Sequence, residues 1–331
     1  MKKNKMRAFL NGFLVVVLLL GSLWPPAPAQ AAFSFPLTET FKGSTTTDWT
    51  LGGTAVLTGG TVVPHPDPAN NGWLRLTTSV NPNGVYQAGY AYYNPPIPTG
   101  RGLVITFDYG VWGGTGADGL SFFLFDGATT TFNVGASGGS LGYAQSSGVN
   151  GLSNGYLGLG LDEFGNYSNP NQSRIGGPGL VPEAVAIRGP GSGMANYVYL
   201  TGTTKLTIAP WSLPKLDCPQ NYTGFTNIGV TNGVCGSDGV TRPGSATYYR
   251  QVQIIVTPVG AAYQVTVAMK FGTSDTFRTL LGPFTIPTSA PGTLKMGFAG
   301  STGGNTNYHE IRNLNVTQQV PDLTASVVFH K

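Results

Sequence analysis

Short stretches of the sequence place hydrogen-bonding groups beside glycine in a way that could form a binding site. Asp118 precedes an apolar run, Gly138 and Gly139 stand side by side, and Asn166 follows further along the chain. A carboxylate and an amide complement a ligand rich in hydroxyl groups, which both donate and accept hydrogen bonds. Glycine lets a backbone N–H approach such a ligand closely. Asp-Gly is also a common turn pair, so a turn before a strand is the alternative interpretation of Asp118.

The patterns expected of a hydrolase are incomplete. Residues 135–139 (Gly-Ala-Ser-Gly-Gly) match the nucleophile-elbow string, but that motif requires a helix after it, and here further glycines follow. The chain has three histidines, His65, His309 and His330, and no His-Glu-x-x-His zinc motif. We expect His309 to be structural. These patterns favour a protein that is not an enzyme.

The elements that must position these residues are predicted to be strands. Short apolar runs are separated by Gly, Pro, Asn and Asp, and the 49 glycines suit strands that are joined by tight turns. Residues 120–125 are apolar on both faces, which predicts a central strand, whereas residues 249–256 alternate as an outer strand does. The predicted strands are Trp73–Thr77, Leu103–Tyr109, Leu120–Phe125, Tyr156–Phe164, Ala184–Arg188, Tyr197–Leu200, Tyr248–Pro258, Tyr263–Phe271, Thr293–Ala299 and His309–Val316.

The N-terminus is predicted to be a signal peptide over residues 1–31. A basic start is followed by the apolar run Phe13–Leu20 and by an Ala-x-Ala pattern at residues 29–31. A membrane span needs about 20 apolar residues, so this run is short, and an uncleaved anchor is the alternative. Four of the 18 basic residues lie in this leader, which has no acid, so 14 basic and 14 acidic residues remain. We therefore expect export, no membrane insertion after cleavage and no nucleic-acid partner.

The two cysteines, Cys218 and Cys235, are predicted to form a disulfide, because an exported protein meets an oxidising environment. The bridge would close a loop of about 17 residues and stabilise the fold by about 3 kcal/mol. The segment between the cysteines is rich in Asn, Gly and Thr, which indicates an exposed excursion. Residues 318–331 are expected to form a linker and a short tail.

Four stretches in this order resemble motifs of the L-type (legume-like) lectin family. They are Ala117–Leu124 with Ala-Asp-Gly-Leu, the Gly-rich Gly138–Tyr143, the metal strand Leu159–Asn166, and Met296–Gly304 followed by His309-Glu310-Ile311. The resemblance spans most of residues 33–317. It implies an all-β fold, a concanavalin-like jelly-roll β-sandwich of antiparallel sheets over residues 32–317. The chain would be similar to exported bacterial-type members, which bind glycans or glycoconjugates outside the cell or at its surface and serve recognition or adhesion.

The resemblance also implies which residues bind carbohydrate. A carboxylate would accept hydrogen bonds from sugar hydroxyls, and the Gly-rich loop would bring a backbone N–H to the sugar. Phe164 or Tyr143 could stack on the apolar face of a sugar, with core packing as the alternative for both. The loop over residues 301–308 is expected to determine which sugar binds. The predicted carbohydrate-binding residues are Asp118, Gly138, Gly139, Phe164, Asn166, Gly303 and Gly304.

The metal strand departs from the family pattern. Gly160 stands where the two-metal lectins have Glu, and no His stands near Ala184, so the transition-metal site is predicted to be lost. Calcium needs only oxygen ligands, and a weakly bound Ca²⁺ is expected at most. A metal-free loop held by Asx turns is the alternative. The predicted ligands are Asp162, the Phe164 carbonyl, Asn166 and Asn171, the last in the place of the family's second Asp.

Two other functions stay open at this point. A structural or adhesive surface protein that no longer binds sugar would also have an altered metal strand, because fold does not fix function. Glucan hydrolases of the same superfamily carry Glu-x-Asp-x-x-Glu on one strand. Both Glu positions are glycine here, at Gly160 and Gly165, and Glu163 would point away from Asp162 in a regular strand.

Overall fold

The computed structural model describes residues 33–79, 84–203, 242, 250–271 and 275–319 of the 331-residue chain. Its strands lie in the unit that runs from Phe35 to Lys331 and form two sheets, in which all the described strand pairs are antiparallel. The eight-stranded sheet has the order β16 (Arg278–Thr285), β15 (Ala262–Phe271), β14 (Arg250–Val259), β7 (Leu103–Trp112), β18 (Tyr308–Gln318), β4 (Leu74–Thr77) and β3 (Val56–Leu57), with β1 (Leu37–Glu39) also paired to β18.

The ten-stranded sheet carries the loops that form the candidate site. Its order is β12 (Ala195–Asn196), β11 (Gly191–Ser192), β9 (Gly155–Asp162), β8 (Gly119–Asp126), β17 (Thr293–Ser301), β5 (Ala88–Tyr93) and β2 (Trp49–Gly53). Three more strands join it: β10 (Ala184–Arg188) pairs with β9, β13 (Tyr199–Gly202) with β10, and β6 (Ile97–Pro98) with β17. Two short 3-10 helices, η1 (Gly138–Ser140) and η2 (Asn166–Ser168), lie in its loops.

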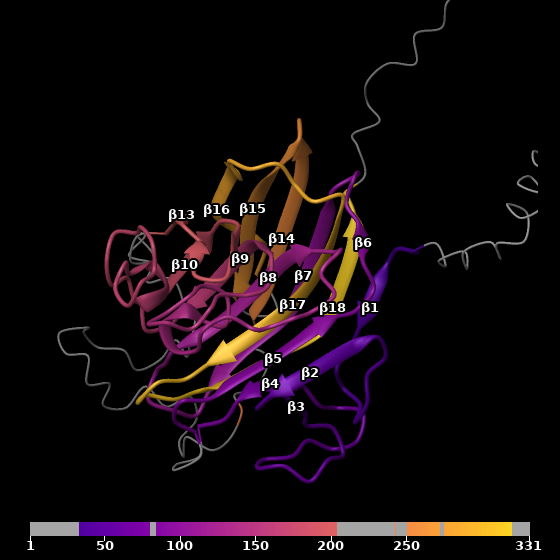
Figure 1. Ribbon diagram of the computed structural model, residues 1–331. Helices are drawn as coiled ribbons and strands as arrows, with labels where there is room; N and C mark the ends of the chain where they lie inside the picture. The colour runs from indigo at the N-terminus through magenta and orange to yellow at the C-terminus, as the bar shows by residue number, and fades with distance from the viewer. Residues whose placement is uncertain (1–32, 80–83, 204–241, 243–249, 272–274, 320–331) are drawn as a thin grey trace, which may run out of the picture. The chain divides into compact units, whose positions relative to one another are not determined.

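The two sheets form two layers (Figure 1). Aromatic side chains pack between these layers. Phe107 of β7 stacks on Phe122 of β8 with ring centroids 6.4 Å apart, and it meets Phe298 of β17 edge-on at 5.0 Å. Because β7 belongs to one sheet and β8 and β17 belong to the other, these contacts lie in the core between the layers. The β-sandwich that the sequence predicts is confirmed.

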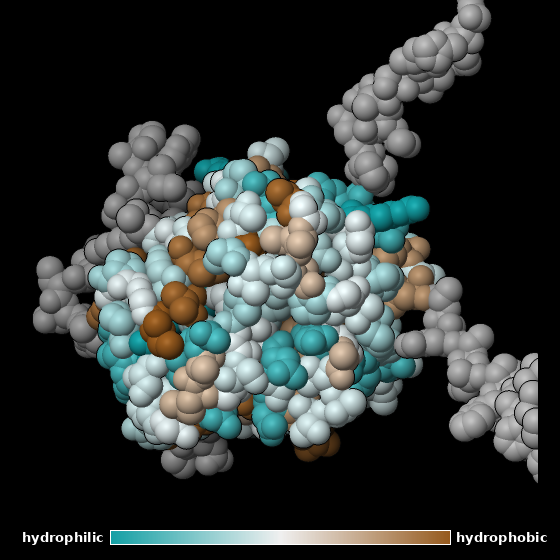
Figure 2. All heavy atoms as spheres, turned by 45° about the horizontal axis from the view of Figure 1, so that its top comes forward, coloured by the Kyte–Doolittle hydropathy of each residue, from teal (hydrophilic) through white to brown (hydrophobic). Residues whose placement is uncertain are grey.

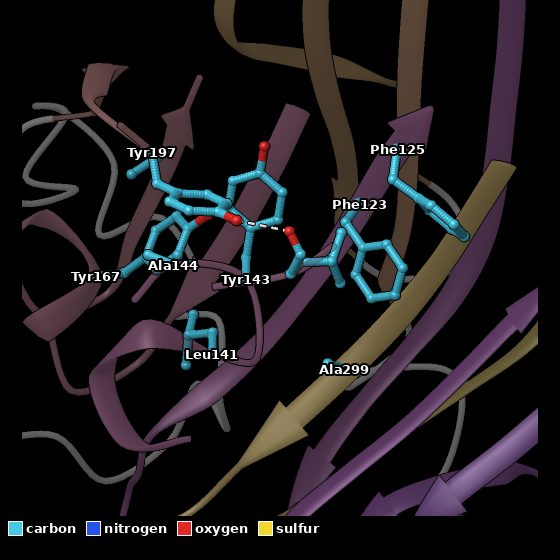
Figure 3. Packing of buried hydrophobic residues seen from close by; sticks show 10 residues of the cluster. Phe123, Phe125, Leu141, Tyr143, Ala144, Tyr167, Tyr197 and Ala299 are labelled. Atoms are coloured by element: carbon cyan, nitrogen blue, oxygen red, sulfur yellow. Dashed lines mark hydrogen bonds between the residues drawn. The ribbon is translucent and has the colours of Figure 1, made fainter. Parts of the chain in front are cut away.

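A second hydrophobic cluster covers the other face of the ten-stranded sheet (Figure 3). Phe123 and Phe125 alternate with the inward-facing Phe122 and therefore point away from the first core. They share this cluster with Tyr143, from the loop after β8, and with Tyr197, which lies between β12 and β13. The Tyr197 hydroxyl donates to the Leu152 carbonyl at 2.6 Å, as the dashed line in Figure 3 shows. The two cores explain why β8 is apolar on both faces, as predicted for a central strand.

Two glycines of β9 leave the space that the tyrosine rings of this cluster occupy. A Cβ at Gly158 would lie 2.1 Å from Tyr143, and a Cβ at Gly160 would lie 2.3 Å from Tyr167. The Tyr167 hydroxyl also donates to the Gly158 carbonyl at 3.0 Å. The ring of Tyr167 thus covers the position where the two-metal lectins have a Glu side chain.

The strand register brings three loops to one end of the ten-stranded sheet. Gly119 on β8 pairs with Asp162 on one side and with Ser301 on the other. Asp118 directly precedes Gly119, one loop begins after Asp162, and another begins after Ser301. Three parts of the chain that are far apart in sequence therefore meet at the same rung.

Each predicted strand overlaps an observed strand, but several boundaries differ. The strand expected over Tyr156–Phe164 ends at Asp162, because the chain turns at Gly165, which has a left-handed φ of 99°. The strand expected at Tyr197 begins instead at Tyr199, since Tyr197 has a φ of 53° and turns into the second cluster. Eight strands were not predicted: the short β1, β3, β6, β11 and β12, and also β2, β5 and β16.

Large hydrophobic side chains lie mainly inside the two cores. On the face in Figure 2, hydrophobic residues form small groups among hydrophilic and neutral ones. The predicted signal peptide over 1–31, Cys218 with Cys235, and the tail from residue 320 lie outside the described residues. In the described part of the chain, no helix has the length and apolar character of a membrane span.

Candidate functional site

A pocket of about 880 Å³ opens where the three loops meet. All seven predicted carbohydrate-binding residues line it, so the structure brings together groups that the sequence spreads over 187 positions. Of the described lining residues, Asp118 is the one with a charged side chain. The lining residues are Tyr86, Ala88, Ala117, Asp118, Val134, Gly135, Ala136, Ser137, Gly138, Gly139, Ser146, Ser147, Val149, Phe164, Asn166, Gln172, Thr302, Gly303, Gly304 and Asn305.

Asp118 is held at the inner wall of the pocket by its backbone. Its N–H donates to the Ser301 carbonyl at 3.0 Å, and its carbonyl accepts from the N–H groups of Glu163 at 3.1 Å and Phe164 at 3.3 Å. The residue is 5% exposed, and its Oδ2 has no hydrogen-bond partner among the residues that the structure describes. A Cβ at Gly303 would lie 3.4 Å from that oxygen, so the glycine keeps the carboxylate uncovered. A buried acceptor without a partner is costly, and a ligand donor in the pocket would satisfy it.

Burial is the largest influence on the charge of this carboxylate. Desolvation, with a smaller contribution from the charge of Glu163, raises the pKa of Asp118 from 3.8 to about 7, against the opposing effects of His309 and Arg174. The folded protein therefore holds the charged form of Asp118 at a cost near neutral pH. Hydrogen bonds from ligand hydroxyl groups would stabilise that charged form.

The Gly-rich loop and Asn166 fit against each other at the next side of the pocket. Gly138 has a φ of 62°, and its carbonyl accepts from the Ser301 hydroxyl at 2.7 Å. A Cβ at Gly139 would lie 2.2 Å from the Cβ of Asn166, so position 139 must be glycine for the two loops to touch. This close approach places a backbone segment and an amide side chain on the same pocket wall.

Two aromatic residues flank these polar groups. Phe164 is half-buried and lies two residues after the end of β9, whereas Tyr86 is 78% exposed. Tyr86 is fixed through its backbone, because its N–H donates to the Gly303 carbonyl at 3.0 Å. Tyr143, the other aromatic candidate, is fully buried in the second cluster, so the prediction that it could stack on a ligand is wrong.

Glu163 and His309 lie below the pocket and are committed to a buried network. The Glu163 carboxylate accepts from the Tyr109 hydroxyl at 3.1 Å and from the Asn307 amide, and it lies 3.0 Å from Nε2 of His309. The other ring nitrogen of His309 lies 2.6 Å from the Thr77 hydroxyl. Glu163 points away from Asp162, as predicted, and gives the pocket no second carboxylate.

The predicted calcium ligands surround Asp162, and their bonding does not fit a calcium ion. Asp162 is fully buried, and its two oxygens accept from the N–H groups of Gly165 at 2.8 Å and Tyr167 at 2.6 Å. The amide oxygen of Asn166 accepts from Asn169 at 3.3 Å. The set holds a single carboxylate, whereas calcium takes six to eight oxygen ligands. No group of three or more His, Cys, Asp or Glu that could hold a metal occurs among the described residues.

The fourth predicted calcium ligand, Asn171, is hydrogen-bonded to an arginine side chain. The Asn171 amide oxygen accepts a hydrogen bond from the guanidinium of Arg174. A second guanidinium, that of Arg188, is fully buried beside the same loop and lies over the Tyr167 ring at 5.4 Å. Both cations interact electrostatically with Asp162. Two positive charges oppose the entry of a dication at this position.

The sequence missed several groups around the pocket. Tyr86, Val149 and Gln172 line it without having been predicted, and neither arginine near Asp162 was assigned a role. The three lining residues stand in irregular loops, where no periodicity indicates the direction of a side chain. Asn305 also lines the pocket, and it lies in the loop over residues 301–308 that was expected to determine which sugar binds.

Comparisons with known proteins identify the fold. No family model and no curated protein matches the sequence. The metal-free form of lectin I-B4 from Griffonia simplicifolia has a TM-score of 0.50 at 15% identity, over 86% of this chain and 100% of that one. Basic winged bean lectin with Tn-antigen gives 0.52 at 16% identity, over 85% and 96%.

A further solved structure agrees with these two. Lectin I from Ulex europaeus, in complex with the methyl glycoside of α-L-fucose, has a TM-score of 0.50 at 16% identity, over 86% of this chain and 98% of that one. The chain therefore has the L-type lectin-like, concanavalin-like fold that the four motifs predicted. At these identities the similarity concerns the fold, and the pocket must be interpreted from its own residues.

Proposed function

We propose that this protein is an exported, non-catalytic lectin that binds carbohydrate in the pocket around Asp118. The observation that carries the proposal is the buried Asp118 carboxylate, whose Oδ2 lies beside Gly138 and Gly303 at the pocket and has no hydrogen-bond partner in the described residues. Sugar hydroxyls donate hydrogen bonds, and a charged acceptor forms the stronger kind. The solved lectins of the same fold are named with sugar ligands, such as Tn-antigen and a fucoside, which agrees with this proposal.

The chemistry of the pocket favours a neutral glycan. Among its described lining residues, the one with a charged side chain is an acid and none is a cation, so an acidic sugar would meet repulsion there. Asn166 and the backbone of the Gly138–Gly139 turn offer both donors and acceptors for further hydroxyl groups. Phe164 and Tyr86 can cover the apolar face of a sugar ring.

The residues of the pocket support the non-catalytic part of the proposal. Glycoside hydrolysis uses a pair of carboxyl groups on either side of the scissile bond. The described lining of the pocket holds one carboxyl group, that of Asp118, because Glu163 is engaged with Tyr109, Asn307 and His309 below it. Export through the leader over residues 1–31 is part of the proposal, and the adhesive protein without sugar binding is the outcome that a negative binding experiment would favour.

A glycan array tests the proposal with a matched pair of variants. Asp118→Asn removes the charged acceptor at the pocket, and Asp126→Asn makes the same change at the other end of β8. We expect binding by the wild type and by Asp126→Asn, and a loss of about tenfold to a hundredfold for Asp118→Asn. Equal binding by both variants would contradict the assignment of Asp118, and no binding by the wild type to any neutral glycan would contradict the function.

A further inference from the structure

Arg174 makes contacts that join the two loops of the pocket. Its Nε donates to the Asn169 carbonyl at 3.2 Å, and its Nη1 donates to the Ser140 hydroxyl at 3.1 Å. Its Nη2 donates to the Asn171 side chain. Ser140 ends η1, directly after the Gly138–Gly139 turn, while Asn169 and Asn171 follow η2. One buried guanidinium thus holds both loops.

The position of Arg174 also balances buried negative charge. Asp118 and Asp162 both stabilise its charged form electrostatically. A guanidinium keeps its charge in proteins, so Arg174 is a permanent cation in a region that holds two buried acids.

The contacts of Arg174 resemble those of a structural metal ion, because one cation binds oxygen atoms from two loops. A metal in such a site would attract Asp162, gather oxygen atoms from the loop after β9 and so fix Asn166 against the Gly-rich loop. Arg174 gathers oxygen atoms from both loops through a rigid, planar fork of donors, which suits several partners at once. The oxygen of Asn171 that was predicted to bind calcium is bound to this fork.

We propose that Arg174 is a built-in cation that takes the place of a metal ion and positions the pocket loops, so that ligand binding needs no divalent metal. The inference rests on the proposed function as far as the ligand is concerned. The claim about the loops and about calcium stands on the contacts of Arg174 itself. Arg174 is a positioning residue, because it acts on the ligand through Ser140, Asn169 and Asn171.

Calcium binding and hydrogen exchange test the claim without any glycan. Calcium chloride is titrated calorimetrically into chelator-treated protein, and amide exchange is followed in residues 138–145 and 164–172. We expect no saturable binding by the wild type at about 1 mM calcium, the weak end for extracellular sites, and unchanged exchange after chelation. Stoichiometric calcium binding that slows exchange in these segments would overturn the proposal.

Variants at position 174 separate a replaced cation from a merely structural side chain. Arg174→Gln should speed exchange in both segments by about tenfold or more, because charge-assisted hydrogen bonds are lost. Arg174→Asp adds a carboxylate near Asp162 and removes the repelling charge, so it should gain calcium binding that the wild type lacks. Unchanged exchange in Arg174→Gln, or no calcium binding by an Arg174→Asp protein with a native circular dichroism spectrum, would contradict the proposal.

Glycan binding completes the test. It distinguishes a failure of the proposed lectin function from a failure of the role proposed for Arg174. With the best array glycan as probe, the wild type should bind equally before and after chelation, and Arg174→Gln should bind about tenfold more weakly or worse. The control Arg278→Gln alters an arginine whose ion pair with Asp275 lies on the eight-stranded sheet, and it should bind as the wild type does. If no glycan binds the wild type, the proposed function fails, while the calcium and exchange results still decide the role of Arg174.

Discussion

Asp118 directly precedes β8, Asp162 ends the neighbouring strand β9, and the two acids differ in how their oxygens are used. Both are buried, and burial raises the pKa of both carboxyl groups. The two oxygens of Asp162 accept backbone hydrogen bonds, whereas Oδ2 of Asp118 has no hydrogen-bond partner in the described part of the chain. A satisfied buried acid organises the protein, and an unsatisfied one beside a pocket is available to a ligand. The two residues should therefore respond in opposite ways to substitution.

The largest loss of stability is expected from substitution of Asp162, the acid whose oxygens are bonded within the protein. Asp162→Ala leaves the buried N–H groups of Gly165 and Tyr167 without acceptors and should lower the free energy of unfolding by about 3 kcal/mol or more. Urea denaturation measures this loss, with Asp126→Ala as a control that should cost about 1 kcal/mol or less. A cost at Asp162 as small as that of the control would show that the two hydrogen bonds do not hold the loop.

The close contact between the Gly-rich loop and Asn166 can be broken separately. Gly139→Ala places a Cβ 2.2 Å from the Cβ of Asn166, so the two loops must separate. We expect glycan affinity to fall about tenfold or more, because overpacking typically costs about 1–3 kcal/mol. Gly292→Ala meets nothing within 4 Å and serves as the control. Wild-type affinity in Gly139→Ala would mean that Asn166 can move without consequence.

Substitution of Asp118, the acid that faces the pocket, should raise the stability of the fold above pH 7, whereas substitution of Asp162 should lower it. Because the pKa of Asp118 is raised to about 7, the folded protein favours the protonated form, and stability is lost as pH rises from about 4 through about 7. Asp118→Asn should therefore stabilise the fold above pH 7 by about 1–3 kcal/mol, while it weakens glycan binding. Thermal denaturation at pH 4 and pH 8 measures this, and a variant that is less stable at pH 8 would remove the contrast with Asp162.

The smallest effect is expected at the rim of the pocket. Tyr86 is 78% exposed and held through its backbone, so Tyr86→Ala should leave stability unchanged. If its ring covers a sugar face, affinity should fall about twofold to tenfold, in line with about 0.5–1.5 kcal/mol for an aromatic contact. Affinity equal to the wild type would place the sugar on the Phe164 side of the pocket.

The fold could be predicted further than the site. The apolar run of β8, the alternation of β14 and the four motifs depend on local sequence, and the observed strands agree with them. The shortest strands have too few residues to show a period-two hydrophobic pattern. Strand β16 contains Pro283, and a proline argues against predicting a strand. The sequence also identified Asp118 and Asn166 as site residues through motif order, and the structure places both at the pocket.

The arginines show what local sequence could not reveal. Arg174 stands in Asn-Pro-Asn-Gln-Ser-Arg, a polar loop whose side-chain directions depend on tertiary contacts. Its role becomes visible only when Ser140, Asn171 and Asp162 are seen around it. The sequence analysis singled out Gly160, but it could not show that the Tyr167 ring lies against this glycine or that two arginines lie near Asp162.

The titration of the Asp118 carboxyl group tests the central claim most directly. Carbon-detected NMR of the side-chain carboxyl would follow its chemical shift against pH, in free protein and with the best-binding glycan present, and the Asp118→Asn spectrum would assign the signal. We predict a pKa of about 7 in free protein, a lower pKa when glycan hydroxyls bind the charged form, and glycan affinity that falls below pH 7. A carboxyl group that titrates at the same pH with and without bound glycan would contradict the account.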